Sequence, residues 1–115
     1  MNVDTLFLLK PDFFDKESGP YFCPHCAQVA GMLAFYPQLK ETVEVRFLEF
    51  PRPRIELVQL LGEQNQSCPV LVLKTPPEGR PSNLKVQEAN GHFFVEGASE
   101  IAEYLARTRG IGMPH

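Results

Sequence analysis

Cys23-Pro24-His25-Cys26 is the stretch of this sequence that most constrains the fold. It lies at the beginning of a helical pattern, in which apolar residues recur at three- and four-residue spacing from Pro24 to about Leu39. Pro24 suits the first turn of a helix, where its missing N–H group is not needed. The pattern therefore predicts that Cys23 lies at or next to the N-cap and that Cys26 lies in the first turn.

Four apolar stretches predict strands before and after this helix. Two are nearly continuous runs typical of buried strands, one alternates with a period of two, and one follows the hairpin signal Asn90-Gly91. In chain order these strands cover residues 5–10, 43–50, 69–73 and 92–95.

Two more helices are predicted, one over residues 55–61, ending at Gly62, and one from about 97 to 110. Residues 11–22 are expected to form a long connection, and residues 74–90 a surface loop. The predicted order is β-α-β-α-β-β-α, with the first two strands parallel. We therefore expect one α/β domain over residues 1–115, with a mixed four-stranded sheet flanked by helices, a core over about 5–109 and a frayed tail at 110–115.

Composition excludes several classes of protein. Of the 115 residues, 11 are Lys or Arg and 14 are Asp or Glu, and the resulting charge of −3 argues against a nucleic-acid partner. No apolar run approaches the ~20 residues that span a bilayer, and the start of the chain has no secretory signal pattern. These features predict a cytoplasmic protein without a membrane partner. In that compartment a CxxC pair is more often catalytic or metal-binding than structural.

The motifs and their order resemble the thioredoxin-like superfamily, particularly glutaredoxins and the N-terminal domains of glutathione transferases. The resemblance runs from Thr5 to about Arg109 and depends on the CxxC motif and on Ser67-Cys68-Pro69 before the third strand. It implies that the Cys68–Pro69 bond is cis and that Pro69 lies against the dithiol. The sequence is also similar to a small bacterial family of uncharacterised thioredoxin-like proteins, which implies a fold but no activity.

The chemistry expected of such a site is thiol–disulfide exchange. A helix N-terminus stabilises a thiolate, so Cys23 is predicted to attack and Cys26 to resolve the mixed disulfide. By resemblance, Pro24 and His25 tune the reduction potential, and His25 lowers the pKa of the attacking thiol. The Pro-His pair is found in strongly oxidising periplasmic relatives, whereas this sequence shows no sign of export, so the direction of the reaction stays open.

Several residues are predicted to contact the substrate, which would be a protein or small-molecule thiol or disulfide. Ser67 and Cys68 adjoin Pro69, and Ser99 stands near the slot that binds the γ-glutamyl carboxylate in relatives that use glutathione, although one residue late. Ser99 is predicted either to cap the last helix or to bind an anion there, so glutathione is an open co-substrate. Arg52 and Arg54, which follow the second strand, either contact an acidic substrate or the glycine carboxylate of glutathione, or lie in a solvated loop. Lys10, at the end of the first strand, either supports the thiolate or lies in solvent.

Cys68 leaves two further alternatives open. It is predicted to form an alternative disulfide with Cys23 or Cys26, or to join both in a zinc or iron–sulfur site with His25 or an external thiol as the fourth ligand. A different class of function is a non-catalytic binding module that uses the 11–22 segment or residues 51–54. The oligomeric state has no signal in the sequence.

Overall fold

The computed structural model describes residues 3–76 and 85–115. Within that part, a five-stranded mixed sheet has the strand order β4-β1-β5-β7-β6, and a separate two-stranded hairpin is formed by β2 and β3. The elements are β1 (Asp4–Leu9), β2 (Phe13–Asp15), β3 (Ser18–Tyr21), α1 (Pro24–Phe35), the 3₁₀ helix η1 (Pro37–Glu41), β4 (Val43–Leu48), α2 (Ile55–Leu61), β5 (Val70–Val72), β6 (Gln87–Ala89), β7 (His92–Glu96) and α3 (Ala98–Arg109).

The sheet is mixed because β1 pairs in parallel with β4 and antiparallel with β5. β7 lies antiparallel to both β5 and β6, and Asn90-Gly91 forms the turn between β6 and β7. The parallel first pair and the Asn90-Gly91 hairpin are confirmed. The prediction of four strands was wrong, because Gln87–Ala89 adds a short fifth strand that is mostly exposed. Residues 77–84 of the predicted surface loop lie outside the described residues.

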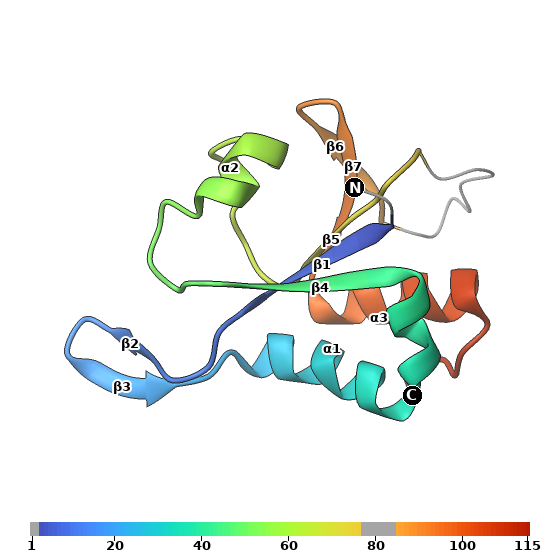
Figure 1. Ribbon diagram of the computed structural model, residues 1–115, viewed down its shortest axis with the longest axis horizontal. Coiled ribbons are helices and arrows are strands. Elements are labelled where there is room, and N and C mark those ends of the chain that lie inside the picture. The colour runs from blue at the N-terminus through green and yellow to red at the C-terminus, as the bar shows by residue number, and fades with distance from the viewer. Residues whose placement is uncertain (1–2, 77–84) are drawn as a thin grey trace.

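Two helices cover one face of the sheet and one helix covers the other, as Figure 1 shows: α1 and α3 lie together on one side and α2 on the opposite side. Successive side chains along a strand point to opposite faces of the sheet, and both faces are buried. In β1, Leu6 and Leu8 face the core beneath α1 and α3, whereas Phe7 faces the smaller core beneath α2. Burial on both faces explains why the predicted strands read as nearly continuous apolar runs.

Helix α1 is shorter than its periodicity predicts. It ends at Phe35 rather than near Leu39, because Pro37 lacks an N–H group and disfavours helical geometry at the residue before it. Tyr36 accordingly leaves the helix, and the chain continues as a 3₁₀ turn. Helix α2 spans the predicted residues and ends at Gly62, and α3 begins after Gly97.

The predicted long connection at 11–22 contains the β2–β3 hairpin, which projects away from the layered body at the left of Figure 1. Within β3, Gly19 has φ +148°, and a Cβ there would lie 2.9 Å from the carbonyl oxygen of Phe13. Phe13 stacks on Phe50 with ring centroids 4.3 Å apart, which fixes the base of the hairpin against the end of β4. The hairpin therefore rises directly beside the dithiol, since Tyr21 is two residues before Cys23.

Across the described ranges, no helix has both the length and the apolar character that a membrane span requires.

Candidate functional site

Cys23 is the N-cap of α1, as predicted, and Pro24 is its first helical residue. The Cys23 backbone is extended, with φ −80° and ψ 112°, so its side chain turns back over the first turn of the helix. The backbone N–H of Cys26 donates a hydrogen bond to Cys23 Sγ at 3.2 Å. The Cys23 sulfur therefore lies at the positive end of the helix dipole, beside the backbone N–H groups that begin the helix.

Cys26 lies one turn further along α1 and is only 4% exposed. The backbone N–H of Leu9 in β1 donates to Cys26 Sγ at 3.5 Å. Burial, reinforced by the hydrogen bond with Cys23, raises the pKa of the Cys26 thiol to about 12. Cys26 is therefore a protonated, sheltered thiol beside a more accessible one, which is the division expected of a resolving and an attacking cysteine.

Cys68 is the third sulfur of the site, and the Cys68–Pro69 bond is cis, as predicted. Burial raises the pKa of the Cys68 thiol to about 11, while the charge of Arg54 acts in the opposite direction and that of Cys23 adds to the increase. Cys23 and Cys68 are both partly buried and pack against the same hydrophobic core beneath α1 and α3. All three cysteines are free thiols.

Arg54 provides a buried positive charge behind these thiols, a role that the sequence did not predict for it. It is 8% exposed, and its guanidinium donates to the carbonyl oxygens of Phe50 (2.7 and 3.1 Å) and Gln66 (2.7 Å). Gln66, itself buried, accepts from the Arg54 backbone N–H at 2.7 Å. Two backbone carbonyls and a fixed amide therefore hold the cation in one geometry, from which it lowers the pKa of Cys68.

A cavity of about 270 Å³, named the polar cavity for the His, Ser and Glu side chains in its lining, brings together half of the ten residues predicted for the site. It is lined by the five predicted residues His25, Ser67, Cys68, Pro69 and Ser99, by Glu96 at the end of β7, and by the first turn of α3 with Glu100. The resemblance-based placement of Ser67 and Ser99 near the dithiol is therefore consistent with the geometry.

Ser99 does not cap α3, so that prediction was wrong. Gly97 is the N-cap, with φ +101° and no side-chain hydrogen bond, and Ser99 is already the second helical residue. The Glu100 carboxylate folds back against Gly97, in the space where a side chain would otherwise stand. The start of α3 thus carries a carboxylate of the chain itself, which disfavours a second carboxylate such as that of glutathione.

Two predicted cations lie further out. Lys10 Nζ pairs with Glu49 Oε1 at 2.8 Å, and both side chains are exposed, so Lys10 belongs to the solvated edge rather than to the thiols. Arg52 is exposed, and it acts on the site only through its charge, which lowers the pKa of Cys68 less than Arg54 does.

A metal site on the three cysteines has no support in the geometry. Within residues 3–76 and 85–115, no three His, Cys, Asp or Glu side chains are grouped in a way that could hold a metal ion.

An apolar cavity of about 250 Å³ lies on the other side of the dithiol. Cys23 and Cys26 line it together with Phe22 and Phe47, two aromatic residues that are 62% and 51% exposed. The sequence predicts no such surface, and its one signal there is the density of aromatic residues in the 11–22 segment.

Comparison with known proteins assigns the chain to a family but to no activity. The model of the family described as "Protein of unknown function (DUF3088)" matches residues 3–113, so the chain belongs to this family. No curated protein and no solved structure matches the chain.

Proposed function

We propose that this protein is a thiol–disulfide oxidoreductase with a thioredoxin-like fold, in which Cys23 attacks and Cys26 resolves. The observation that carries the proposal is the pairing at the start of α1, where an N-cap sulfur accepts the Cys26 N–H at 3.2 Å and the second thiol is buried one turn away. The strand order β4-β1-β5-β7 and the cis bond before Pro69 support the fold assignment. The presence of three free thiols suits a reducing compartment, so we place the activity in the cytoplasm.

The exchange follows from the two environments. The Cys23 thiolate attacks one sulfur of a substrate disulfide, a mixed disulfide forms, and the other substrate sulfur leaves and takes up a proton. Cys26 then loses its proton, attacks Cys23 Sγ and releases the second substrate thiol. The protein is left with a Cys23–Cys26 disulfide, which an external dithiol reduces. The reverse sequence would oxidise a dithiol substrate, and the reduction potential decides between the two directions.

The proposal is tested by trapping the mixed disulfide. With bis(2-hydroxyethyl) disulfide, we expect the Cys26→Ser,Cys68→Ser double variant to hold a mercaptoethanol adduct on Cys23, detectable by intact mass and peptide mapping. The Cys68→Ser variant keeps the dithiol and is the matched control: it should form the Cys23–Cys26 disulfide and retain no adduct. Turnover of the same disulfide by Cys23→Ser at the wild-type rate would contradict the assignment.

A non-catalytic binding module is the second candidate, and one observation favours it. The β2–β3 hairpin and the residue after it expose Phe14, Tyr21 and Phe22, aromatic side chains that soluble surfaces rarely gather without a partner. This function predicts that the two cysteines of α1 do not cycle between dithiol and disulfide in redox buffers. A titration of the Cys23–Cys26 pair in dithiothreitol buffers distinguishes the two candidates.

A further inference from the structure

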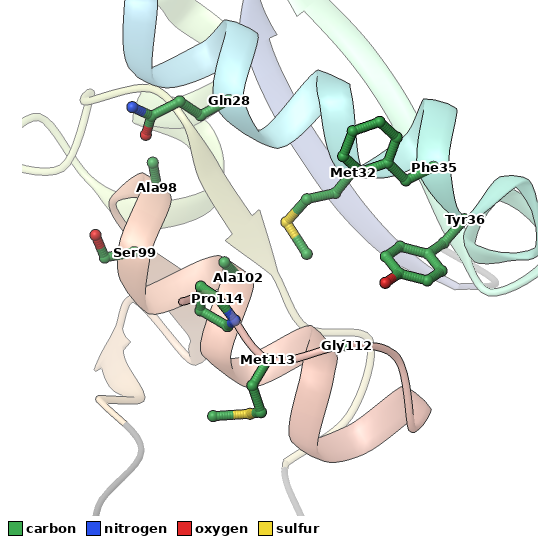
Figure 2. Close-up of a pocket in the computed structure, with 10 residues that line it drawn as sticks. All are labelled: Gln28, Met32, Phe35, Tyr36, Ala98, Ser99, Ala102, Gly112, Met113 and Pro114. Carbon is green, nitrogen blue, oxygen red and sulfur yellow. The ribbon is translucent and has the colours of Figure 1, made fainter.

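The largest of the cavities described here lies between α1 and α3, beneath the C-terminal segment (Figure 2). Its volume is about 370 Å³, within the range of small-molecule pockets. Met32 enters it from α1 and Tyr36 from the residue that follows this helix, Ala98 and Ala102 face them from α3, and Pro114 also lines it. Because most of these groups are apolar, the cavity suits an apolar ligand.

The C-terminal segment forms a wall of this cavity rather than the frayed tail that the sequence predicted. Ile111 packs against the core beneath α1 and α3. A Cβ on Gly112 would lie 2.6 Å from Tyr36 Oη, so a larger residue here would require the Tyr36 side chain to move. Met113 follows and also lines the cavity. The segment is thus fitted against α1 although it has no regular secondary structure.

The apolar cavity between α1 and α3, the α1–α3 cavity, adjoins the polar cavity of the candidate redox site. Ala98 and Ser99 line both cavities, so the two cavities meet at the first turn of α3. The polar cavity is lined by Cys68 and by His25, which stands between Cys23 and Cys26 in the first turn of α1. A single elongated molecule can therefore present a sulfur to the thiols while its apolar part extends between the two helices.

We propose that the substrate is a disulfide that carries an unbranched apolar chain, with the chain bound in the α1–α3 cavity. This inference rests on the proposed function and specifies its substrate class. Cys23 would attack the disulfide next to His25 and Cys68, releasing the thiol of one half and forming a mixed disulfide with the other half. Attack by Cys26 would release the second thiol, and an external dithiol would reduce the Cys23–Cys26 disulfide.

The first test compares kcat/KM for bis(2-hydroxyethyl) disulfide with that for n-hexyl 2-hydroxyethyl disulfide. Each buried methylene strengthens binding about fourfold, so four added methylenes in a partly open cavity should raise kcat/KM at least about tenfold. Turnover of both disulfides at the same kcat/KM would overturn the inference while leaving the oxidoreductase proposal intact.

Cavity filling gives the second test. Ala102→Leu occupies the space opposite Met32, and it should reduce the hexyl preference to less than about threefold, with folding checked by thermal unfolding. Ala34→Leu makes the same change on the exposed face of α1, outside the cavities described, and should keep both activities and the preference. A preference that survives Ala102→Leu unchanged would contradict this binding mode.

The cavity can also be tested without any redox step. The sequence has three methionines, and Met32 and Met113 line the cavity, so ¹³C-labelled methionine methyl groups report on it directly. The unreactive thioether n-hexyl 2-hydroxyethyl sulfide should shift both methyl resonances in a saturable way, and Ala102→Leu should weaken this binding several-fold. Absence of shifts would overturn the inference, as would shifts that follow protein concentration, since a second copy would then cover the cavity. If no disulfide is turned over but the thioether binds, the proposed function fails and the apolar site remains.

Discussion

Alkylation of the three cysteines at neutral pH tests the electrostatic description of the site. The thiolate is the reactive form, so a raised pKa lowers the reactive fraction. For Cys26, a pKa of about 12 against an ordinary 9.0 makes the thiolate about a thousandfold rarer than in an ordinary thiol at the same pH. For Cys68, a pKa of about 11 makes it about a hundredfold rarer.

A more basic thiolate is also more nucleophilic, and this partly offsets the decrease in rate that the smaller thiolate fraction causes. With a Brønsted coefficient near 0.45, the net rate should fall about 40-fold for Cys26 and about tenfold for Cys68. Burial adds a steric barrier at Cys26, which is 4% exposed. Cys23, which lies at the surface of the N-cap and accepts an N–H group, should therefore be alkylated first.

The assay treats reduced protein with iodoacetamide at pH 7 beside N-acetylcysteine and follows each cysteine by peptide mass spectrometry. The same reaction in guanidinium chloride should make the three rates similar, because unfolding removes both burial and the hydrogen bond. In the folded protein without denaturant, the alkylation rate of Cys26 should rise about tenfold for each pH unit between pH 7 and 10, because this range lies below the pKa of the thiol. Alkylation of folded Cys26 at the rate of N-acetylcysteine, or faster than Cys23, would refute the assignment of roles.

Two other substitutions test how the site is supported. Arg54→Met leaves two buried carbonyl groups without their charged donor, so the free energy of unfolding in urea should fall by about 3 kcal/mol. Alkylation of Cys68 should also slow, because the cation that lowers the pKa of this thiol is gone. An unchanged urea midpoint would show that the hydrogen bonds of the guanidinium contribute little to stability. Gly19→Ala should destabilise the hairpin by about 1–3 kcal/mol, since φ is +148° and the new Cβ meets the carbonyl of Phe13. Hydrogen exchange should show faster opening of the hairpin amides, and unchanged protection there would contradict this reasoning.

The elements that the sequence predicted well have strong local signals. The start of α1 combines a proline suited to the first turn with a long apolar period, and α2 ends at a glycine, Gly62. The buried strands are recognisable because they are apolar on both faces. The elements that were missed lack such signals, because β2, β3 and β6 are only three or four residues long and mostly exposed.

Residues of the site divide in the same way. Cys23, Cys26 and Pro69 could be predicted because their positions follow from motif and strand order. Arg54 could not, because the Pro-Arg-Pro-Arg segment resembles a solvated loop and the carbonyls that bury its guanidinium come from Phe50 and from Gln66, twelve residues away. Hydrogen bonds to backbone carbonyl groups produce no residue pattern by which a sequence could predict them.

The charges around the polar cavity bear on what can enter it. Glu96 and Glu100 line its α3 side, and Glu100 already lies against the helix start where an anionic ligand would gain most from the dipole. Arg54, the nearest buried cation, is directed at backbone carbonyls rather than toward a ligand. A substrate with a carboxylate head would meet repulsion there, and no lysine or arginine is among the cavity's described lining residues to balance it. Recognition of an uncharged disulfide through an apolar chain avoids this repulsion, so in this protein we expect the tail of the substrate, more than its head, to determine affinity.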